Sequence, residues 1–531
     1  MSEIHFLLFL SFVWLVWFTW KTFRPRNQHS LRSVAILVLG DIGRSPRMMY
    51  HAQSFAENGF VTDLIGYGGS KPIPALERLP RVQLRQLPEV PKLLNILPFL
   101  ILAPVKIVHQ VISILLCLLF WIDVPPEFIL VQNPPSIPTL ALVQLVGRIR
   151  GSRVIIDWHN LGYSILSLKL GKNHILVRIA KSFEETFGYS AYAHLFVTRA
   201  MRDFLVKEWD LQGHKVVLYD RPPRHFHRCS TQEIHELFCK LQPVLSSQKS
   251  LKCFLPDANP PYSTGFTHTS SKSGKPASRL PSPIRHDLPT YSEVQMPTLR
   301  PDRTALLVSS TSWTPDEDFT ILLEALQIYE GRAREITAKL PMDSASADGN
   351  LPKLLVIVTG KGPLREKYMK EVGELQETWR WVKCISLWLE AEDYPILLGS
   401  ADLGVSLHAS SSELDLPMKV VDMFGCGLPV CALDFACLNE LVKNGKNGLV
   451  FQTASQLALQ LEQLLLSYPD APALHSLTLA LAGLPHGPLT PSNPHIPKQY
   501  ATREQDNWTW STWEENWGRV VRPLILSDVN L

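Results

Sequence analysis

The chain has 531 residues, which is too long for one compact hydrophobic core and predicts two domains with additional segments. Its 52 basic and 49 acidic residues nearly balance, which excludes a dedicated nucleic-acid-binding protein. The eight cysteines lack the spacing of a metal site, and this favours free thiols in a reducing compartment over a disulfide framework.

The first predicted element is an uncharged apolar segment at residues 4–20, at the lower end of the length that crosses a membrane. A cleaved signal peptide is the alternative, but no basic region precedes the segment and no small-residue cleavage site follows it. Because Lys21, Arg24 and Arg26 follow the segment, the positive-inside rule places the rest of the chain in the cytosol. We therefore expect residues 1–22 to be a membrane signal-anchor.

Short apolar runs alternate with helix-length segments between residues 30 and 240, which predicts a Rossmann-like domain with a parallel sheet and crossover helices. Within this domain, residues 93–122 are strongly apolar but are interrupted by Pro98 and Pro104. We expect this segment to be membrane-associated and to dip into the bilayer. A buried core helix is the alternative.

The composition changes after residue 240. Residues 241–303 are rich in Pro, Ser, Thr and Lys and have little apolar periodicity, which predicts a disordered insertion or linker. Strands and helices alternate again at residues 304–470, which predicts a second Rossmann-like domain. The tail at residues 471–531 is rich in tryptophan, and the spacing of these residues predicts a packed terminal helix. They are Trp508, Trp510, Trp513 and Trp517.

In the first domain, a glycine turn follows the first predicted strand and precedes a helix. Gly43 lies in this turn, and Arg44 and Arg47 are placed to bind a diphosphate. A solvated basic turn is the alternative. Asp41 lies in the same turn and is a candidate general base.

A later predicted strand of the first domain has three polar residues at its carboxyl end: Asp157, His159 and Asn160. Polar groups at the carboxyl end of a parallel sheet point toward the ligand. Asp157 would orient His159 as a general base, although a structural Asp–His pair is the alternative. Our order of preference for the base is His159, then Asp157, then Asp41.

Residues 411–430 are the most informative part of the second domain, because a polar loop leads into a short helix and a buried strand. Glu413 and Asp415 precede the helix, Lys419 lies in its first turn, and Asp422 lies on the same face. This arrangement suits a nucleotide sugar. Backbone amides and the ammonium would bind the diphosphate, and a carboxylate would bind the ribose hydroxyls.

Two further loops of the second domain follow predicted strands. Gly360 and Lys361 form a glycine turn with a lysine at the position expected for a phosphate, and a plain tight turn is the alternative. Trp313 either borders the donor site or packs in the core. The residues after it, 314–317, have the pattern of a helix cap.

Together these motifs resemble those of the chitobiosyldiphosphodolichol β-mannosyltransferases, a family of glycosyltransferases with the GT-B fold. The resembling segments are residues 40–48, 157–160, 311–319 and 414–425. The resemblance implies two Rossmann-like α/β domains with parallel sheets that face a cleft, preceded by an N-terminal membrane anchor helix.

The resemblance also implies transfer of mannose from GDP-mannose to N,N′-diacetylchitobiosyl-diphosphodolichol, the first mannosylation step in lipid-linked oligosaccharide synthesis for protein N-glycosylation. It implies a single-pass protein of the endoplasmic reticulum membrane with cytosolic catalytic domains, in complexes with later mannosyltransferases of the pathway. Because the donor is α-linked and the product β-linked, the reaction inverts configuration and needs one general base. We expect Arg44, Lys361 and Lys419 to stabilise the leaving GDP, so that neither a metal nor another cofactor is needed.

The chain departs from the pattern of retaining GT-B enzymes, in which two glutamates are separated by seven residues. Asp422 stands at the second position and Leu414 at the first, which leaves the sugar contact to Glu413 or Asp415. Two other functions remain open. One is a transferase for another polyprenyl-linked acceptor, and the other is an inactive GT-B homologue that acts as a membrane scaffold. The charged residues of the diphosphate site argue against the scaffold.

Overall fold

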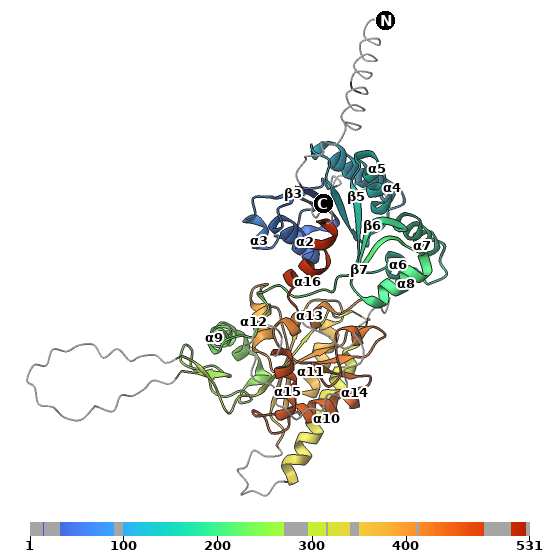
Figure 1. Ribbon diagram of the computed structural model, residues 1–531. Coiled ribbons are helices and arrows are strands. Elements are labelled where there is room, and N and C mark those ends of the chain that lie inside the picture. The colour runs from blue at the N-terminus through green and yellow to red at the C-terminus, as the bar shows by residue number, and fades with distance from the viewer. Residues whose placement is uncertain are drawn as a thin grey trace, which may run out of the picture. The chain divides into compact units, whose positions relative to one another are not determined.

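The structure is a computed structural model that describes Trp14 and residues 32–89, 99–269, 296–314, 317–339, 350–409, 414–482 and 511–526. Apart from that tryptophan, the expected signal-anchor at residues 1–22 lies outside these ranges. Within them, no helix combines the length and the apolar character needed to cross a lipid bilayer. The chain divides into two compact units (Figure 1). The first comprises Met1–Asp220, Ser411–Leu416 and Trp513–Leu531, and the second comprises Arg221–Ser410 and Pro417–Thr512.

The first unit is built on a seven-stranded sheet in the order β3-β2-β1-β4-β5-β6-β7, and every neighbouring pair is parallel. The strands are β1 (Ser33–Asp41), β2 (Val61–Tyr67), β3 (Val82–Gln86), β4 (Phe128–Asn133), β5 (Arg153–Trp158), β6 (Ser190–Phe196) and β7 (Gln212–Val217). The strand order reverses between β1 and β4, and ligands of such sheets bind near this switch point.

Helices cover both faces of this sheet. They are η1 (Ile42–Arg44), α2 (Pro46–Glu57), α3 (Pro74–Glu77), α4 (Phe99–Leu116), η3 (Cys117–Trp121), α5 (Thr139–Arg150), α6 (Gly162–Leu170), α7 (Ile175–Gly188) and α8 (Arg199–Trp209). Successive residues of a strand point to opposite faces, so Ile36 and Leu37 of β1 belong to two different apolar clusters. The central strands β1, β4 and β5 are largely buried apolar runs, and these runs made them predictable, whereas β3 and β7 are more polar and more exposed.

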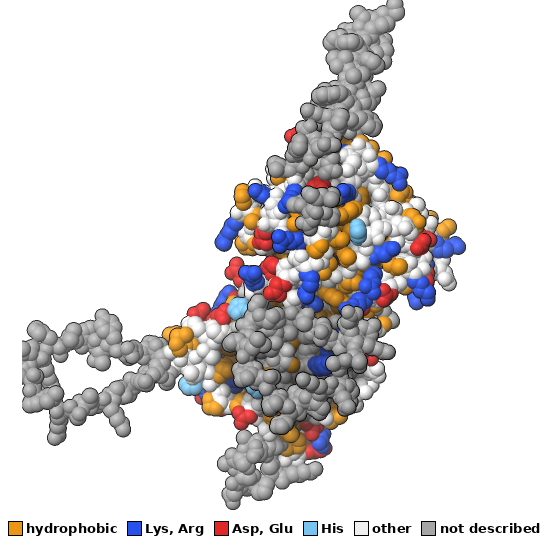
Figure 2. Space-filling model, in the orientation of Figure 1, with side chains coloured by type: hydrophobic (Ala, Val, Ile, Leu, Met, Phe, Trp, Pro, Cys, Tyr) orange, Lys and Arg blue, Asp and Glu red, His pale blue; other side chains and the backbone are white. Residues whose placement is uncertain are grey.

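The described part of the apolar segment at residues 93–122 is α4 followed by η3. Ile114, Cys117 and Leu118 are fully buried in the core of the first unit. Ile107, Val108, Ile112, Leu116 and Trp121 are exposed large apolar side chains. Apolar side chains reach the surface in the region that Figure 1 labels α4 (Figure 2). One side of the segment is thus core, as the alternative reading had it, and the other side is an exposed apolar surface.

The end of the chain completes the first unit. In α16 (Trp513–Val520), the indole N–H of Trp517 donates to His51 Nδ1 at 3.1 Å and that of Trp513 donates to Ser54 Oγ at 3.0 Å. Both acceptors belong to α2, which lies beside α16 (Figure 1). A last short helix, α17 (Arg522–Ile525), follows. The spacing of the tryptophans had predicted such a packed terminal helix.

The second unit contains a six-stranded parallel sheet in the order β12-β11-β10-β13-β14-β15. Its strands are β10 (Ala305–Ser310), β11 (Leu354–Thr359), β12 (Val382–Leu387), β13 (Leu403–Ser406), β14 (Val430–Leu433) and β15 (Gly448–Phe451). Its helices are α9 (Thr231–Ser247), η4 (Lys249–Leu251), α10 (Phe319–Lys339), α11 (Arg365–Leu375), α12 (Asp393–Ser400), α13 (Met418–Gly425), η5 (Leu438–Glu440), α14 (Ala454–Leu465) and α15 (Pro472–Ala482). The strand order reverses between β10 and β13.

The boundaries differ from those predicted. The units divide after Asp220, whereas we expected the first domain to reach residue 240. The reason is that the next residues pack on the second unit: Arg228 Nη1 donates to Ala401 O at 2.5 Å, and a Cβ on Gly425 would lie 2.5 Å from Pro222 Cγ. Such tertiary contacts leave no local pattern in the sequence.

The insertion predicted at residues 241–303 also contains more structure than expected. α9 extends to Ser247, and β8 (Thr267–His268) pairs with β9 (Thr298–Leu299) in an antiparallel ladder. Residues 270–295 lie outside the described ranges.

Candidate functional site

The second unit holds a buried carboxylate, Glu317, which follows β10 at the carboxyl edge of the sheet. One oxygen, Oε2, accepts hydrogen bonds from Thr311 Oγ1 and from the backbone N–H of Ser312, both at 2.5 Å. The other oxygen, Oε1, forms an ion pair with Lys419 and lies 3.9 Å from His408 Nδ1. We call these five residues the Glu317 cluster.

Glu317 is held in its charged form. Burial by itself would raise the pKa of this carboxyl, but the nearby imidazole of His408 and the charge of Lys419 lower it to about 2. The carboxylate is therefore an anchor for the lysine and not a proton donor near neutral pH.

Lys419 lies in the first turn of α13, and a quarter of its side chain (25%) is exposed. Its Nζ also lies 3.3 Å from Ser312 Oγ. An ammonium has three N–H donors, so one remains beyond these two described partners. The backbone amides at the start of α13 add partial positive charge, which favours negative charge at this end of the helix.

His408 was missed in the sequence analysis. It follows β13, the neighbour of β10 across the switch point, and its side chain is 22% exposed. Its Nε2 is a buried nitrogen with no hydrogen-bond partner in the described part of the chain. A histidine directly after a buried strand is the signal we used for His159, and it would have found His408.

The loop after β11 packs directly on the loop after β10. Gly360 has φ = +121°, and a Cβ there would lie 1.8 Å from the carbonyl oxygen of Thr311. A Cβ on Gly362 would lie 1.9 Å from the carbonyl oxygen of Ser312. Only glycine fits at either position. Between them, the ammonium of Lys361 lies 3.6 Å from the ring centroid of the exposed Trp388, a cation–π contact.

Trp313 occupies the core, the second of the two roles that the sequence left open. Its side chain is 1% exposed and packs against Phe319 and Tyr368. Its indole N–H donates to Gly360 O at 3.2 Å. The ring therefore supports the glycine loop from inside and does not reach a donor directly.

The three predicted acidic donor contacts have different positions. Asp422 is half-buried on α13, near the half-buried Tyr394, whose hydroxyl lies 3.0 Å from Ser310 Oγ. Asp415 belongs to the short segment that groups with the first unit, where Thr198 Oγ1 donates to Leu414 O at 2.6 Å. Glu413 lies outside the described residues.

In the first unit, Asp157 is the second-last residue of β5 and is fully buried. Arg47 donates to both of its oxygens, from Nε at 2.8 Å and from Nη2 at 2.9 Å. The Nε2 atoms of His51 and His159 lie 3.2 Å and 2.8 Å from Oδ2. We call these four residues the Asp157 cluster.

The surroundings of Asp157 exclude it as the proton acceptor. Burial alone would raise its pKa, but the charge of Arg47 and the hydrogen bonds from His159 and His51 hold the pKa well below its usual range. The carboxylate is a positioning group: by accepting from His159 Nε2–H, it leaves Nδ1 of that ring as the basic nitrogen. The side chain of His159 is 22% exposed, so it can meet a ligand.

Arg47 does not reach the surface, which corrects its predicted diphosphate role. It is 4% exposed and makes a second ion pair with Asp220 at 2.7 Å and a hydrogen bond to Leu218 O at 2.9 Å. It therefore ties α2 to β5 and to the segment after β7. Arg44 differs, because 82% of its side chain is exposed and its Nε lies 3.6 Å from Asp41.

Asp41 and Gly43 shape the turn after β1. Asp41 accepts hydrogen bonds from Ser70 Oγ at 2.7 Å and from the backbone N–H of Gly43 at 3.0 Å. The hydrogen bonds from Ser70 lower the pKa of Asp41, which makes it a weaker base than an ordinary carboxylate. A Cβ on Gly43 would lie 2.5 Å from Ser70 O, so glycine is needed for this close approach.

Glu184 is a second residue that the sequence analysis missed. It lies on α7, is fully buried, and accepts from the backbone N–H groups of Gly162 and Tyr163 at 2.8 Å and 3.3 Å. It thereby caps α6, the helix that follows His159. No local sequence signal marks this role, because the carboxylate and the amides are about twenty residues apart.

Comparisons with known proteins are consistent with this geometry. Residues 343–467 match the family described as "Glycosyl transferases group 1". Over 94% of its length the chain is 42% identical to the chitobiosyldiphosphodolichol beta-mannosyltransferase of Mus musculus, of which it covers 91%. It is also 41% identical to the UDP-glycosyltransferase TURAN of Arabidopsis thaliana, with 83% of this chain and 91% of that protein covered.

Among solved structures, sucrose-phosphate synthase from Thermosynechococcus elongatus matches with a TM-score of 0.50 and 11% identity, over 85% of this chain and 93% of that one. At this identity the likeness concerns the fold alone.

Proposed function

The chain belongs to the family of chitobiosyldiphosphodolichol β-mannosyltransferases, and we propose that it transfers mannose from GDP-mannose to N,N′-diacetylchitobiosyl-diphosphodolichol. It is a glycosyltransferase of dolichol-linked glycan synthesis with the GT-B fold. The observation that carries the proposal is the 42% identity over 94% of the chain.

The second unit supplies the proposed donor site. Lys419, Lys361 and the first amides of α13 would bind the diphosphate and stabilise its charge as GDP leaves. Asp422 would accept hydrogen bonds from the ribose hydroxyls. The Glu317 cluster supports this site, because Glu317 fixes the ammonium of Lys419 and is itself charged.

The first unit supplies the proposed acceptor chemistry. His159 would take the proton from the acceptor 4-hydroxyl as that oxygen attacks the anomeric carbon of mannose and the bond to GDP breaks. Asp157 would hold the imidazole in the required tautomer. Arg44, with its exposed guanidinium, would bind the diphosphate of the lipid-linked acceptor.

We further propose that transfer needs no metal ion, because lysines and helix amides can balance the charge of the leaving GDP. The protein would be anchored in the endoplasmic reticulum membrane by residues 1–22, with its catalytic units in the cytosol, and would associate with later mannosyltransferases of the pathway. The exposed apolar side of α4 would lie at that membrane.

A transfer assay tests the proposal. Purified full-length protein is given the acceptor phytanyl-diphosphate chitobiose with GDP-mannose, UDP-glucose or UDP-N-acetylglucosamine, in parallel arms with and without EDTA. We expect a trisaccharide from GDP-mannose alone that a β-mannosidase cleaves and whose initial rate of formation EDTA does not change.

The other outcomes separate the alternatives. A product from a UDP-sugar would replace the donor assignment, which matters because one relative is named a UDP-glycosyltransferase. GDP binding without transfer would indicate another polyprenyl-linked acceptor. Folded protein that binds no nucleotide would support the scaffold.

A further inference from the structure

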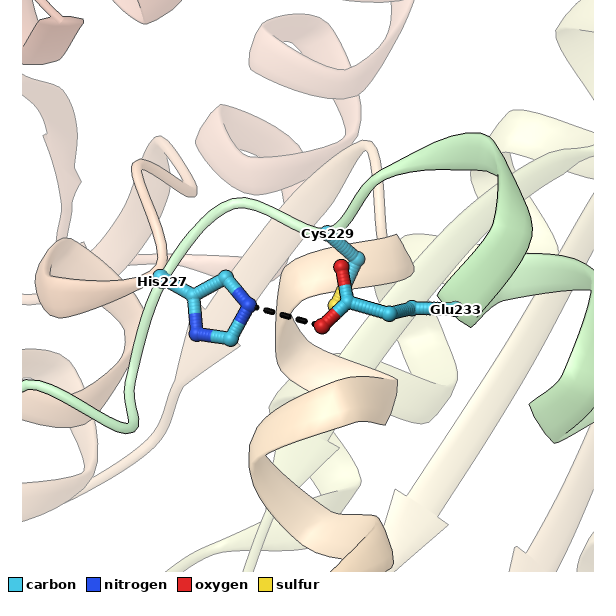
Figure 3. A group of neighbouring side chains, drawn as sticks. All are labelled: His227, Cys229 and Glu233. Carbon is cyan, nitrogen blue, oxygen red and sulfur yellow. Dashed lines mark hydrogen bonds and ion pairs between the residues drawn. The ribbon is translucent and has the colours of Figure 1, made fainter.

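Three side chains with metal-binding atoms lie together in the second unit, apart from the residues of the proposed donor site (Figure 3). His227 and Cys229 belong to the loop before α9, and Glu233 belongs to the first turn of that helix. One donor atom from each residue lies within 4.8 Å of the other two. The imidazole and the thiol approach the carboxylate from the loop side (Figure 3).

The hydrogen bonds of His227 place its Nε2 against a carboxylate oxygen, so that a proton or a metal ion is required between them. Nδ1 lies 3.1 Å from the carbonyl oxygen of His225, and since a carbonyl only accepts, Nδ1 carries the proton. In the neutral ring Nε2 is then a bare acceptor, yet it lies 2.9 Å from Glu233 Oε1, another acceptor. Either a proton or a metal ion must relieve this contact. A ligand histidine whose second N–H donates to a backbone carbonyl is the usual arrangement in metal sites.

The two carboxylate oxygens of Glu233 have different surroundings. Oε2 accepts from the backbone N–H and from the hydroxyl of Ser230, both at 2.8 Å, and this closes the capping box of α9. These hydrogen bonds lower the pKa of Glu233, so the group is charged near neutral pH. Oε1 faces His227 and is the oxygen available to a cation.

Cys229 is held in place by the backbone of α12. Its Sγ lies 3.5 Å from Ile396 O, and its backbone N–H donates to Gly399 O at 3.2 Å. A Cβ on Gly399 would lie 2.5 Å from Cys229 Sγ and 2.5 Å from the carbonyl oxygen of His227, so glycine lets the loop sit this close. Burial raises the pKa of the thiol to about 11, which keeps it protonated until a metal displaces the proton.

We propose that His227 Nε2, Cys229 Sγ and Glu233 Oε1 bind one zinc ion, with water as the fourth ligand. A set of imidazole, thiolate and carboxylate suits Zn²⁺ and is a poor site for Mg²⁺ or Ca²⁺, which prefer oxygen ligands. Binding releases the thiol proton to solvent and forms the Zn–S bond. The ion would link the loop that carries His227 and Cys229 to Glu233 in the first turn of α9. It would thereby also stabilise the packing of this loop on α12. It has no part in the proposed sugar transfer.

The test uses full-length protein that has been stripped with a chelator and titrated with ZnCl₂ against a chromophoric competitor. A parallel titration with CoCl₂ reports the thiolate directly, because a sulfur-to-cobalt charge-transfer band appears only when a cysteine is a ligand, and loss of the band in Cys229→Ser assigns it to Cys229. We expect one equivalent of metal, this band, and a higher unfolding temperature in zinc than after stripping.

Three variants make the test specific. Cys229→Ser removes the thiolate, and Glu233→Gln removes one charged ligand while a glutamine can still close the capping box. Cys253→Ser changes an exposed cysteine outside the cluster and is the control. We expect zinc affinity to fall about 100-fold in the first two variants and to stay unchanged in the control.

Each other outcome overturns the proposal. If zinc affinity is the same in Cys229→Ser as in the wild type, the ion is adventitious. If the cobalt band is missing from the wild type, Cys229 is not a ligand. Should Cys229→Ser fail to fold, Glu233→Gln decides alone: unchanged zinc affinity and an unchanged zinc-dependent rise in unfolding temperature would contradict the site.

Discussion

The Asp157 cluster of the first unit and the Glu317 cluster of the second are built on the same plan. In each, a buried carboxylate at the carboxyl edge of a parallel sheet stays charged because cations and hydrogen bonds outweigh the cost of burial. They differ in the cation. Arg47 is buried and donates hydrogen bonds to Asp157, to Asp220 and to a backbone carbonyl, whereas Lys419 is partly exposed.

This difference in exposure distinguishes a cation that stabilises the fold from a cation that can bind a ligand. A buried cation that is hydrogen-bonded to buried groups stabilises the fold, and it can act on a ligand only by orienting a neighbour. A cation that is partly exposed and has a donor to spare can bind the ligand itself. We therefore propose that His159 contacts the ligand in the first cluster and that Lys419 contacts it in the second.

The largest effect should follow from breaking the buried pair. Arg47→Met leaves Asp157 charged and buried without its guanidinium, and we expect the free energy of unfolding to fall by about 3–5 kcal/mol in urea denaturation. Arg44→Met, three residues earlier in the chain and exposed, is the control and should change it by less than about 0.5 kcal/mol. Equal losses in both variants would contradict the comparison.

The next effect concerns the proposed base. His159→Ala should lower kcat about 1,000-fold because the acceptor hydroxyl loses its proton acceptor, while GDP binding stays unchanged. The rate is measured with saturating GDP-mannose. His475→Ala, at an exposed position of α15, serves as the matched control. Full turnover by folded His159→Ala protein would remove this residue from the role.

The donor site should show a smaller effect. Lys419→Met removes the ammonium proposed to stabilise the leaving GDP, and we expect kcat/KM for GDP-mannose to fall about 100-fold. Lys446→Met changes an exposed lysine of the same unit and should have wild-type kinetics. Because Lys419 also pairs with Glu317, circular dichroism must show that the variant is folded. Unchanged kinetics would place the diphosphate elsewhere.

The smallest effect is a dependence of stability on pH. The pKa of Glu317 is about 2 in the folded protein, below its ordinary value of 4.5. A lowered pKa stabilises the folded state fully above about pH 4.5, and this stabilisation is lost as the pH falls toward 2. The difference in urea midpoint between the wild type and Glu317→Gln should therefore shrink between pH 6 and pH 3. A difference that does not change with pH would show that the charge has no role.

Most of the fold could be predicted from the sequence because its central strands are buried on both faces. Alternating strands and helices were expected at residues 304–470, and β11, from Leu354 to Thr359, is one of the buried strands found there. The family could be predicted because its motifs lie in the loops after these strands. The same loops gave Lys419 and His159 as candidates, and the structure places both where a ligand can reach them.

Burial of individual polar residues could not be predicted. Arg44 and Arg47 have the same local pattern, and only the tertiary contact between Arg47 and Asp157 decides which of them is buried. Glu317 had the pattern of a helix cap, since its partner Lys419 lies about one hundred residues later. A search for cysteine spacing likewise overlooked a cluster that combines His227, Cys229 and Glu233.

The position of α16 has a consequence for how the protein is made. The first unit begins with β1, but its core includes Trp513, Trp517 and Val521 from the end of the chain. During synthesis, α2 must therefore wait for its covering helix until the ribosome has translated the entire second unit. A nonsense mutation just before Trp513 would leave the second unit complete, but it would remove α16 and expose the core of the first unit.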